Sequence, residues 1–113
     1  MKEQPILKRI LLACSRGSTR LWRNNCGQLK DERGTWVRFG VANPGGSDLI
    51  GWDSVVVTPE MVGRRITIFT AFEVKQKRGR ATKEQLAFIA NVQRAGGIAG
   101  VVRSVEEAKS LLT

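Results

Sequence analysis

The chain has 113 residues with 19 Lys and Arg against 10 Asp and Glu, a net charge of +9, and neither histidine nor tyrosine. These absences exclude histidine-based nucleases, tyrosine recombinases and imidazole-ligated zinc sites, while the charge is typical of a protein that meets phosphate backbones. No apolar run approaches the ~20 residues that span a bilayer, and no signal pattern opens the chain. We therefore expect a soluble cytoplasmic protein with no membrane partner, folded as one domain over residues 1–113.

The first predicted element is an amphipathic helix. Pro5 suits the first turn of a helix, and apolar residues recur at helical spacing to about Ser15. Residues 20–27 then interleave basic, aromatic and amide side chains, and residues 30–34 form a polar turn. The chain thus begins with a helix and a polar, cationic segment.

Two strands are predicted next. Residues 36–41 alternate in the manner of a strand, which Asn43-Pro44-Gly45-Gly46 ends. A second strand is expected to begin at Asp48 itself and run to Trp52. Because Val55-Val56-Val57 follows, we expect this strand to extend into residues 53–65 before an exposed connection.

The second half predicts a strand, a helix, a strand and a helix. Their expected ranges are 66–75, 83–95, 98–103 and 104–112. Thr82 and Gln85 have the spacing of a helix capping box. Because a whole helix separates the last two strands, we expect them to be parallel. The predicted order is helix, three strands, helix, strand, helix.

Glu73 and Lys75 end the third predicted strand two residues apart, so both side chains should lie on one face. With a second carboxylate from Asp48, this is the outline of a magnesium-binding nuclease site. The alternative is an ordinary solvated ion pair at a strand end. Gln85 is expected either to cap its helix or to take part in catalysis. The two roles do not exclude each other.

These motifs, in their order, resemble the virus-type replication-repair nuclease (VRR-Nuc) family, a compact branch of the PD-(D/E)XK nucleases. The resemblance covers nearly the whole chain, and it rests on the following segments: Arg23-Asn24-Asn25-Cys26-Gly27, Gly46-Ser47-Asp48-Leu49-Ile50-Gly51, Phe72-Glu73-Val74-Lys75 and Gln85. It implies an α/β, restriction-endonuclease-like core with a central mixed β-sheet flanked by helices. The family's usual proline before the first acid is replaced by Ser47.

The resemblance also implies roles for individual residues. Asp48 and Glu73 match the two acids that bind Mg²⁺ or Mn²⁺, and the backbone carbonyl of Val74 is implied as a further ligand. Lys75 matches the catalytic lysine and Gln85 a glutamine on the following helix. Family members often carry a glutamate on the first helix, for which Glu3 is the acid near the right place. Because proline follows Gln4, we expect Glu3 to lie just outside that helix.

Two basic regions are predicted to hold DNA. Cations on phosphates give salt-dependent, largely sequence-independent affinity. The predicted contacts are Lys77, Arg78, Arg80 and Lys83 after the third strand, and Arg20, Arg23, Asn24 and Asn25 before the first. The tryptophans at positions 22, 36 and 52 are expected in the core.

The resulting hypothesis is a divalent-metal-dependent endonuclease that cuts branched DNA. Stand-alone relatives look like dimeric, junction-resolving enzymes of bacteriophages, so we expect a homodimer acting on four-way (Holliday) junctions in DNA repair. One alternative is a restriction-like, nicking or flap nuclease. The alternative from another class is a non-catalytic basic protein that binds nucleic acid.

Overall fold

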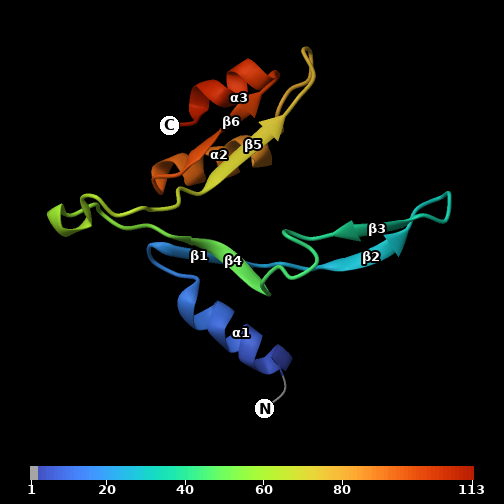
Figure 1. Ribbon diagram of the computed structural model, residues 1–113, viewed down its shortest axis with the longest axis horizontal. Coiled ribbons are helices and arrows are strands. Elements are labelled where there is room, and N and C mark those ends of the chain that lie inside the picture. Colours follow the sequence, from blue (N-terminus) through green and yellow to red (C-terminus); the bar gives the residue numbers. More distant parts are fainter. Residues whose placement is uncertain (1–2) are drawn as a thin grey trace. The chain divides into compact units, whose positions relative to one another are not determined.

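The computed structural model describes residues 3–113, which fall into two compact units, one ending at Asp53 and the other beginning at Ser54. The first unit combines one helix with paired strands, and the second combines several helices with a strand pair (Figure 1). The chain is therefore of the mixed α/β class, as predicted. No helix within residues 3–113 is long and apolar enough to cross a membrane.

The first unit is built on an antiparallel strand pair covered by a helix. Its elements are α1 (Glu3–Cys14), β1 (Thr19–Arg23), β2 (Gly27–Lys30), β3 (Trp36–Phe39) and β4 (Leu49–Asp53). β1 pairs with β4 and β2 pairs with β3, both antiparallel. Leu7 of α1 is buried, and α1 packs against β1. The β2–β3 hairpin extends beyond the β1–β4 pair (Figure 1).

Cross-strand side chains fix the register of β1 and β4. At one end the Thr19 hydroxyl donates to the Asp53 carboxylate over 2.8 Å. Trp22 and Trp52 point to one face and meet edge to face, with ring centroids 5.0 Å apart. A Cβ atom at position 51 would overlap the carbonyl of Arg20, so glycine is what allows the two strands to approach there.

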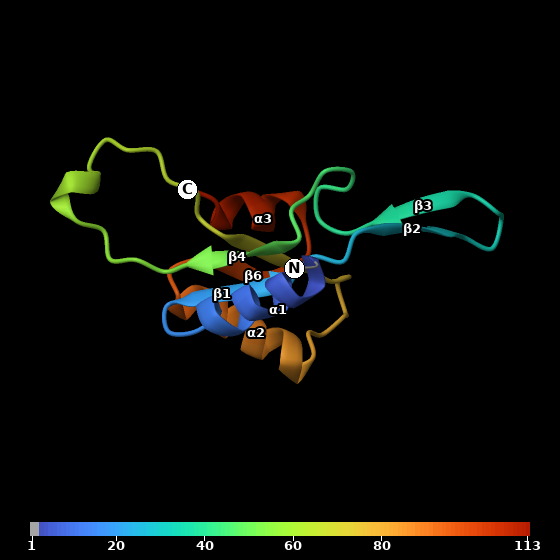
Figure 2. The same ribbon diagram turned by 90° about the horizontal axis from the view of Figure 1, so that it is seen from below.

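The second unit is a parallel strand pair between two helices. Its elements are β5 (Thr70–Val74), α2 (Lys83–Arg94), β6 (Ile98–Val102) and α3 (Val105–Leu111). Figure 2 shows α2 and α3 on opposite sides of the β5–β6 pair. The buried side chains of this unit are Ile89, Val92, Ala99 and Val102. This is a strand–helix–strand crossover in which both faces of the pair are covered.

The strands differ from the prediction in several ways, and β4 begins at Leu49 rather than at Asp48. The polar segment 20–27 holds β1 and the start of β2, which the mixture of side chains concealed. β4 ends at Asp53 rather than extending through the valines, because its partner β1 begins opposite, at Thr19, and offers no further hydrogen bonds. The third predicted strand forms only over Thr70–Val74, where β6 can pair with it. Residues 62–69 stay irregular.

Some of the remaining predictions from the sequence are confirmed and others are wrong. The strands pair as three two-stranded sheets, so the described residues do not show one central sheet. The parallel pairing of β5 with β6, the capping box and the final helix are confirmed. Trp36 is 62% exposed and Trp22 40%, so these two were wrongly assigned to the core. Glu3 begins α1 rather than preceding it, since Pro5 falls in the first turn, where amides have no helical partner.

Candidate active site

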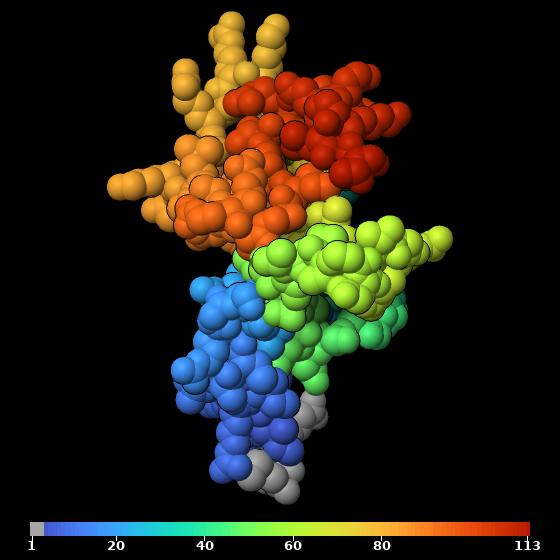
Figure 3. Space-filling model, turned by 90° about the vertical axis from the view of Figure 1, so that its left-hand side faces the viewer, coloured from blue at the N-terminus to red at the C-terminus, as the bar shows by residue number. Residues whose placement is uncertain are grey.

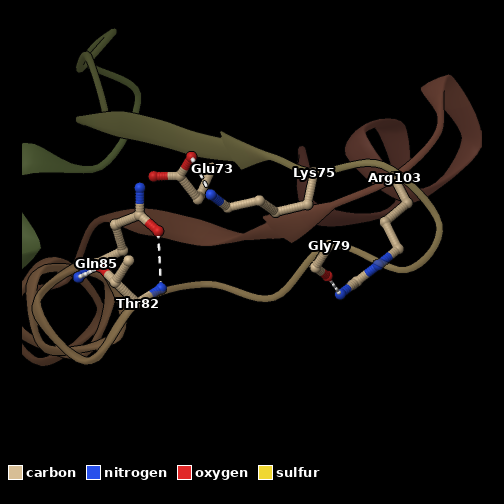
Figure 4. A network of polar contacts seen from close by, with 6 residues as sticks. All are labelled: Glu73, Lys75, Gly79, Thr82, Gln85 and Arg103. Atoms are coloured by element: carbon tan, nitrogen blue, oxygen red, sulfur yellow. Dashed lines mark hydrogen bonds and ion pairs between the residues drawn. The ribbon is translucent and has the colours of Figure 1, made fainter.

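Strand β5 presents a carboxylate and an ammonium on one face. Glu73 and Lys75 are two residues apart, and the Lys75 Nζ atom lies 3.9 Å from a carboxylate oxygen of Glu73 (Figure 4). Both side chains are partly covered, with exposed fractions of 29% for Glu73 and 22% for Lys75. The pair is thus less solvated than a typical surface ion pair, which strengthens its field. It is also open enough to meet a ligand.

The backbone of β5 leaves a carbonyl beside this pair. The amide of Ile98 donates to the Phe69 carbonyl, and the amide of Lys75 donates to the Val102 carbonyl. Backbone groups of a strand alternate in direction, so the carbonyl of Val74 points away from β6. Within the described residues β5 pairs only with β6. The Val74 oxygen is therefore oriented toward the open edge of β5, where a ligand could reach it.

Gln85 combines a structural contact with a position beside the acid. Its Oε1 accepts from the Thr82 amide over 2.8 Å, and its own amide donates to the Thr82 hydroxyl over 3.1 Å. This completes the capping box of α2. The side-chain NH2 group is not used by the cap, and Figure 4 shows it directed toward the carboxylate of Glu73. Both interpretations of Gln85 from the sequence thus fit this geometry.

The basic loop between β5 and α2 is anchored at its turn. The Gly79 amide donates to the Gln76 carbonyl over 2.9 Å, and the Arg103 guanidinium donates to the Gly79 carbonyl over 2.8 Å (Figure 4). Arg103 follows β6 and was not singled out from the sequence, because nothing in its neighbourhood indicates a contact 24 residues away. The gold side chains of the loop project from the second unit in Figure 3. The exposed cations are Lys77, Arg78, Arg80 and Lys83.

Asp48 is delivered by the first unit on a loop that Asn24 holds in place. The Asn24 side-chain amide donates to the carbonyls of Val41 and Ser47, over 2.9 and 3.1 Å, and its oxygen accepts from the Val41 amide over 2.8 Å. The Asn24 backbone amide donates to the Asp48 carbonyl over 2.8 Å. A Cβ atom at Gly46 would overlap the Val41 carbonyl, so this close loop requires glycine. Asp48 is exposed and directly precedes β4.

An apolar hollow of about 220 Å³ adjoins Asp48. It is lined by Ile6, Leu7 and Ile10 of α1, together with Asp48 and Leu49. Glu3 lies one turn before Leu7 in the same helix. The helix that carries Glu3 therefore runs beside the loop that carries Asp48.

The predicted DNA contacts of the first unit divide into two groups. The Arg20 guanidinium donates to the carbonyls of Gly17 and Thr19, both over 2.7 Å, and the Asn24 amide is held as described. Arg23 and Asn25 are exposed. Arg20 and Asn24 thus stabilise turns, whereas Arg23 and Asn25 are available to a ligand.

Carboxylates and a backbone carbonyl are hard oxygen donors, which suit Mg²⁺ or Mn²⁺. Neither unit, over the residues that the structure describes, gathers three acidic or cysteine side chains into a cluster. Asp48 belongs to the first unit and Glu73 to the second. Glu73 and the Val74 carbonyl are thus the candidate donors of the second unit, and Asp48 is the candidate donor of the first.

Comparison with protein families identifies the class. The VRR-NUC domain model matches residues 3–106, which run through both units. The chain belongs to the VRR-NUC family. Membership makes it a structure-specific nuclease with DNA as its substrate. No curated protein and no solved structure matches the chain.

Proposed function

We propose that the chain is a divalent-metal-dependent endonuclease that hydrolyses phosphodiester bonds in branched DNA, with four-way junctions as the preferred substrate. The observation that carries the proposal is the partly covered Glu73–Lys75 pair on β5, beside an outward-pointing carbonyl. A simple solvated ion pair would not account for the side-chain amide of Gln85, which is directed at the same acid. The motif Gly46-Ser47-Asp48-Leu49-Ile50-Gly51, which resembles that of the family, supports adding Asp48 to this set.

The metal ligands would be Asp48, Glu73 and the carbonyl of Val74, with Glu3 as a further acid. The position of Glu3 at the start of α1, whose next turns line the hollow beside Asp48, supports its inclusion. Mg²⁺ or Mn²⁺ bound there would neutralise charge on the phosphate and lower the pKa of a coordinated water.

The other residues act on the phosphate and on its neighbours. The ammonium of Lys75 favours negative charge as it builds on the phosphoryl oxygens. Gln85 orients Glu73 or contacts the scissile phosphate. The cations of the loop after β5 hold adjoining phosphates, with Arg23 and Asn25 as a second contact region. Such contacts recognise the shape of the DNA rather than its sequence, which suits a branched substrate.

Symmetric cutting supports a homodimer. A chain of this size has room for one active site, and resolving a junction requires two cuts. A two-fold dimer places two identical sites in opposite orientations. We propose this assembly, with products that carry 5′-phosphates and a role in DNA repair of bacteriophages.

A cleavage assay tests the proposal. Labelled linear, flapped and four-way DNA are incubated with the protein in magnesium, in manganese and in chelator. We expect cutting of the junction only with metal, and loss of cutting with retained binding in Asp48→Asn, Glu73→Gln and Lys75→Met. Glu106→Gln and Lys109→Met remove the same charges from exposed positions of α3 and should cleave normally.

Three results would overturn parts of the proposal. Cutting in chelator, or full activity of Glu73→Gln, would remove the metal mechanism. Equal cutting of linear duplex at defined sites would favour a restriction-like nuclease. Binding without any cleavage would leave a non-catalytic DNA-binding protein, and light scattering would test the dimer.

A further inference from the structure

The β2–β3 hairpin has two chemically different faces. Residues that lie directly opposite in an antiparallel pair point to the same face, and faces alternate along each strand. The pairs Leu29–Val37 and Gly27–Phe39 therefore form one face, which is apolar. The pairs Gln28–Arg38 and Lys30–Trp36 form the other, which we call the arm face (Gln28, Lys30, Trp36 and Arg38).

The hairpin is held firmly at its base. The Asn43 side-chain amide donates to the carbonyls of Gly27 and Phe39, over 2.9 and 2.8 Å. The Phe39 ring lies so close to Gly27 that a Cβ atom there would overlap it. An isolated two-stranded hairpin is marginal in water, so these contacts matter for its order. They also fix which way the arm face points within the first unit.

The arm face presents two cations and an indole to solvent. The Lys30 ammonium lies 5.2 Å from the centroid of the Trp36 ring, and that residue is nevertheless 62% exposed. Arg38 lies two residues after Trp36 on β3 and is also exposed. The indole ring is thus open to a ligand and can offer an aromatic plane for stacking.

Acidic groups near the hairpin tip do not cancel this charge. The Asp31 carboxylate accepts from the backbone amides of Arg33 and Thr35, both over 2.9 Å, and so is turned into the loop. Glu32 lies at the tip next to Arg33, outside the paired strands. The arm face itself contains cations and no carboxylate.

We propose that the arm face binds DNA, with Lys30 and Arg38 on phosphates and Trp36 stacked on the exposed face of a base at the branch point. Cations that follow a backbone, combined with an aromatic platform, are the chemistry by which proteins hold unpaired nucleic acid. The inference rests on the proposed action on branched DNA. It adds a contact surface distinct from the basic loop after β5 and from residues 20–25.

The test is the salt dependence of binding, measured by fluorescence anisotropy with a labelled four-way junction in chelator, where the protein does not cut. The double variant Lys30→Gln/Arg38→Gln should lower the slope of log affinity against log salt by about two, close to 0.9 for each lost phosphate contact. The matched control Arg94→Gln/Lys109→Gln lowers the net charge equally from the second unit. Equal slopes for the two doubles would overturn the proposal.

The stacking role of Trp36 is tested by comparing an aliphatic with an aromatic replacement. Trp36→Leu keeps an apolar side chain but loses the aromatic plane, and should weaken binding by about fivefold or more, whereas Trp36→Phe should stay near wild type. Unchanged binding in Trp36→Leu would overturn the stacking. A Trp36→Leu variant that changes its assembly state but binds DNA normally would also overturn the stacking. The arm face would then be a contact between copies of the chain. Circular dichroism checks that each variant is folded.

Failure of this inference and failure of the nuclease proposal give different results. If the arm variants bind and cut like wild type, the arm face is not a DNA contact but the nuclease stands. If wild-type protein binds the junction through the arm face without cutting it in any metal, the nuclease proposal fails and the arm stands.

Discussion

The two units present their carboxylates by different physical means. Glu73 lies within a strand whose position is set by packing, since β5 and β6 lie between α2 and α3 around the fully buried Val92. Asp48 lies on a loop set by hydrogen bonds, mostly from one amide side chain, in a unit where Leu7 is the buried apolar residue among those described. Packing is spread over many atoms, whereas the loop depends on a few donors. The two acids should therefore respond differently to substitution.

The largest effect is expected from Val92→Ala. Losing two methyl groups from a fully buried site should lower the free energy of unfolding by about 2–3 kcal/mol, because a cavity forms between α2 and the strands. Leu7→Ala removes more atoms but should cost less, since its neighbours Ile6 and Ile10 are already part exposed and adjoin a hollow. Urea unfolding measures both values. A larger loss in Leu7→Ala would show that packing also dominates the first unit.

The corresponding weak point of the first unit is Asn24. In Asn24→Asp a carboxylate replaces the amide and faces the carbonyls of Val41 and Ser47, so two hydrogen bonds become repulsions. We expect a loss of about 1–3 kcal/mol and at least a tenfold slower cleavage, because the loop that carries Asp48 shifts. Asn91→Asp makes the same charge change at an exposed position of α2 and is the control. Equal cleavage by both variants would contradict the role given to Asn24.

The same contrast explains how much could be predicted from the sequence. The second unit follows local rules, so the parallel strands, the capping box and the final helix are correctly predicted. β1 was missed because its side chains do not alternate and its partner β4 lies far along the chain. β2 was missed because it is only four residues long and lies between the polar segment and the predicted turn. The Val55-Val56-Val57 run has strand-forming residues but no partner, and it stays exposed. Whether each of these segments forms a strand was thus decided by the presence of a pairing partner, rather than by the β-propensity of its residues.

Capping and orientation by Gln85 can be separated with a pair of variants. Thr82→Ala removes the hydroxyl that caps α2 and should cost about 1 kcal/mol of stability with cleavage close to wild type. Gln85→Ala loses the reciprocal hydrogen bond and also the amide directed at Glu73, so both stability and cleavage should fall. Thermal unfolding and single-turnover cleavage provide the two measurements. If both variants cut equally well, Gln85 acts only as a cap.

The smallest effect concerns the connection that opens the second unit, where Pro59–Met61 forms a short 3-10 helix. Glu60 accepts hydrogen bonds from its own backbone amide and, more weakly, from the Thr58 hydroxyl, which hold the pKa of this carboxyl below its usual 4.5. A lowered pKa means that any stabilisation is present above the unfolded value and is lost as the pH falls below 4.5. For a fully exposed group the effect on stability is negligible, so the measurement is a carbon-detected NMR titration of the carboxyl group.

That titration decides whether the two hydrogen bonds to the Glu60 carboxylate form in solution. We expect a midpoint below 4.5 in the wild type and a partial return toward 4.5 in Thr58→Val, which keeps the shape but removes the hydroxyl. A wild-type midpoint at 4.5 would mean that the Glu60 carboxylate does not accept these two hydrogen bonds in solution. The turn would then depend on its backbone alone, in which the amides of Met61 and Val62 donate to the carbonyls of Thr58 and Pro59.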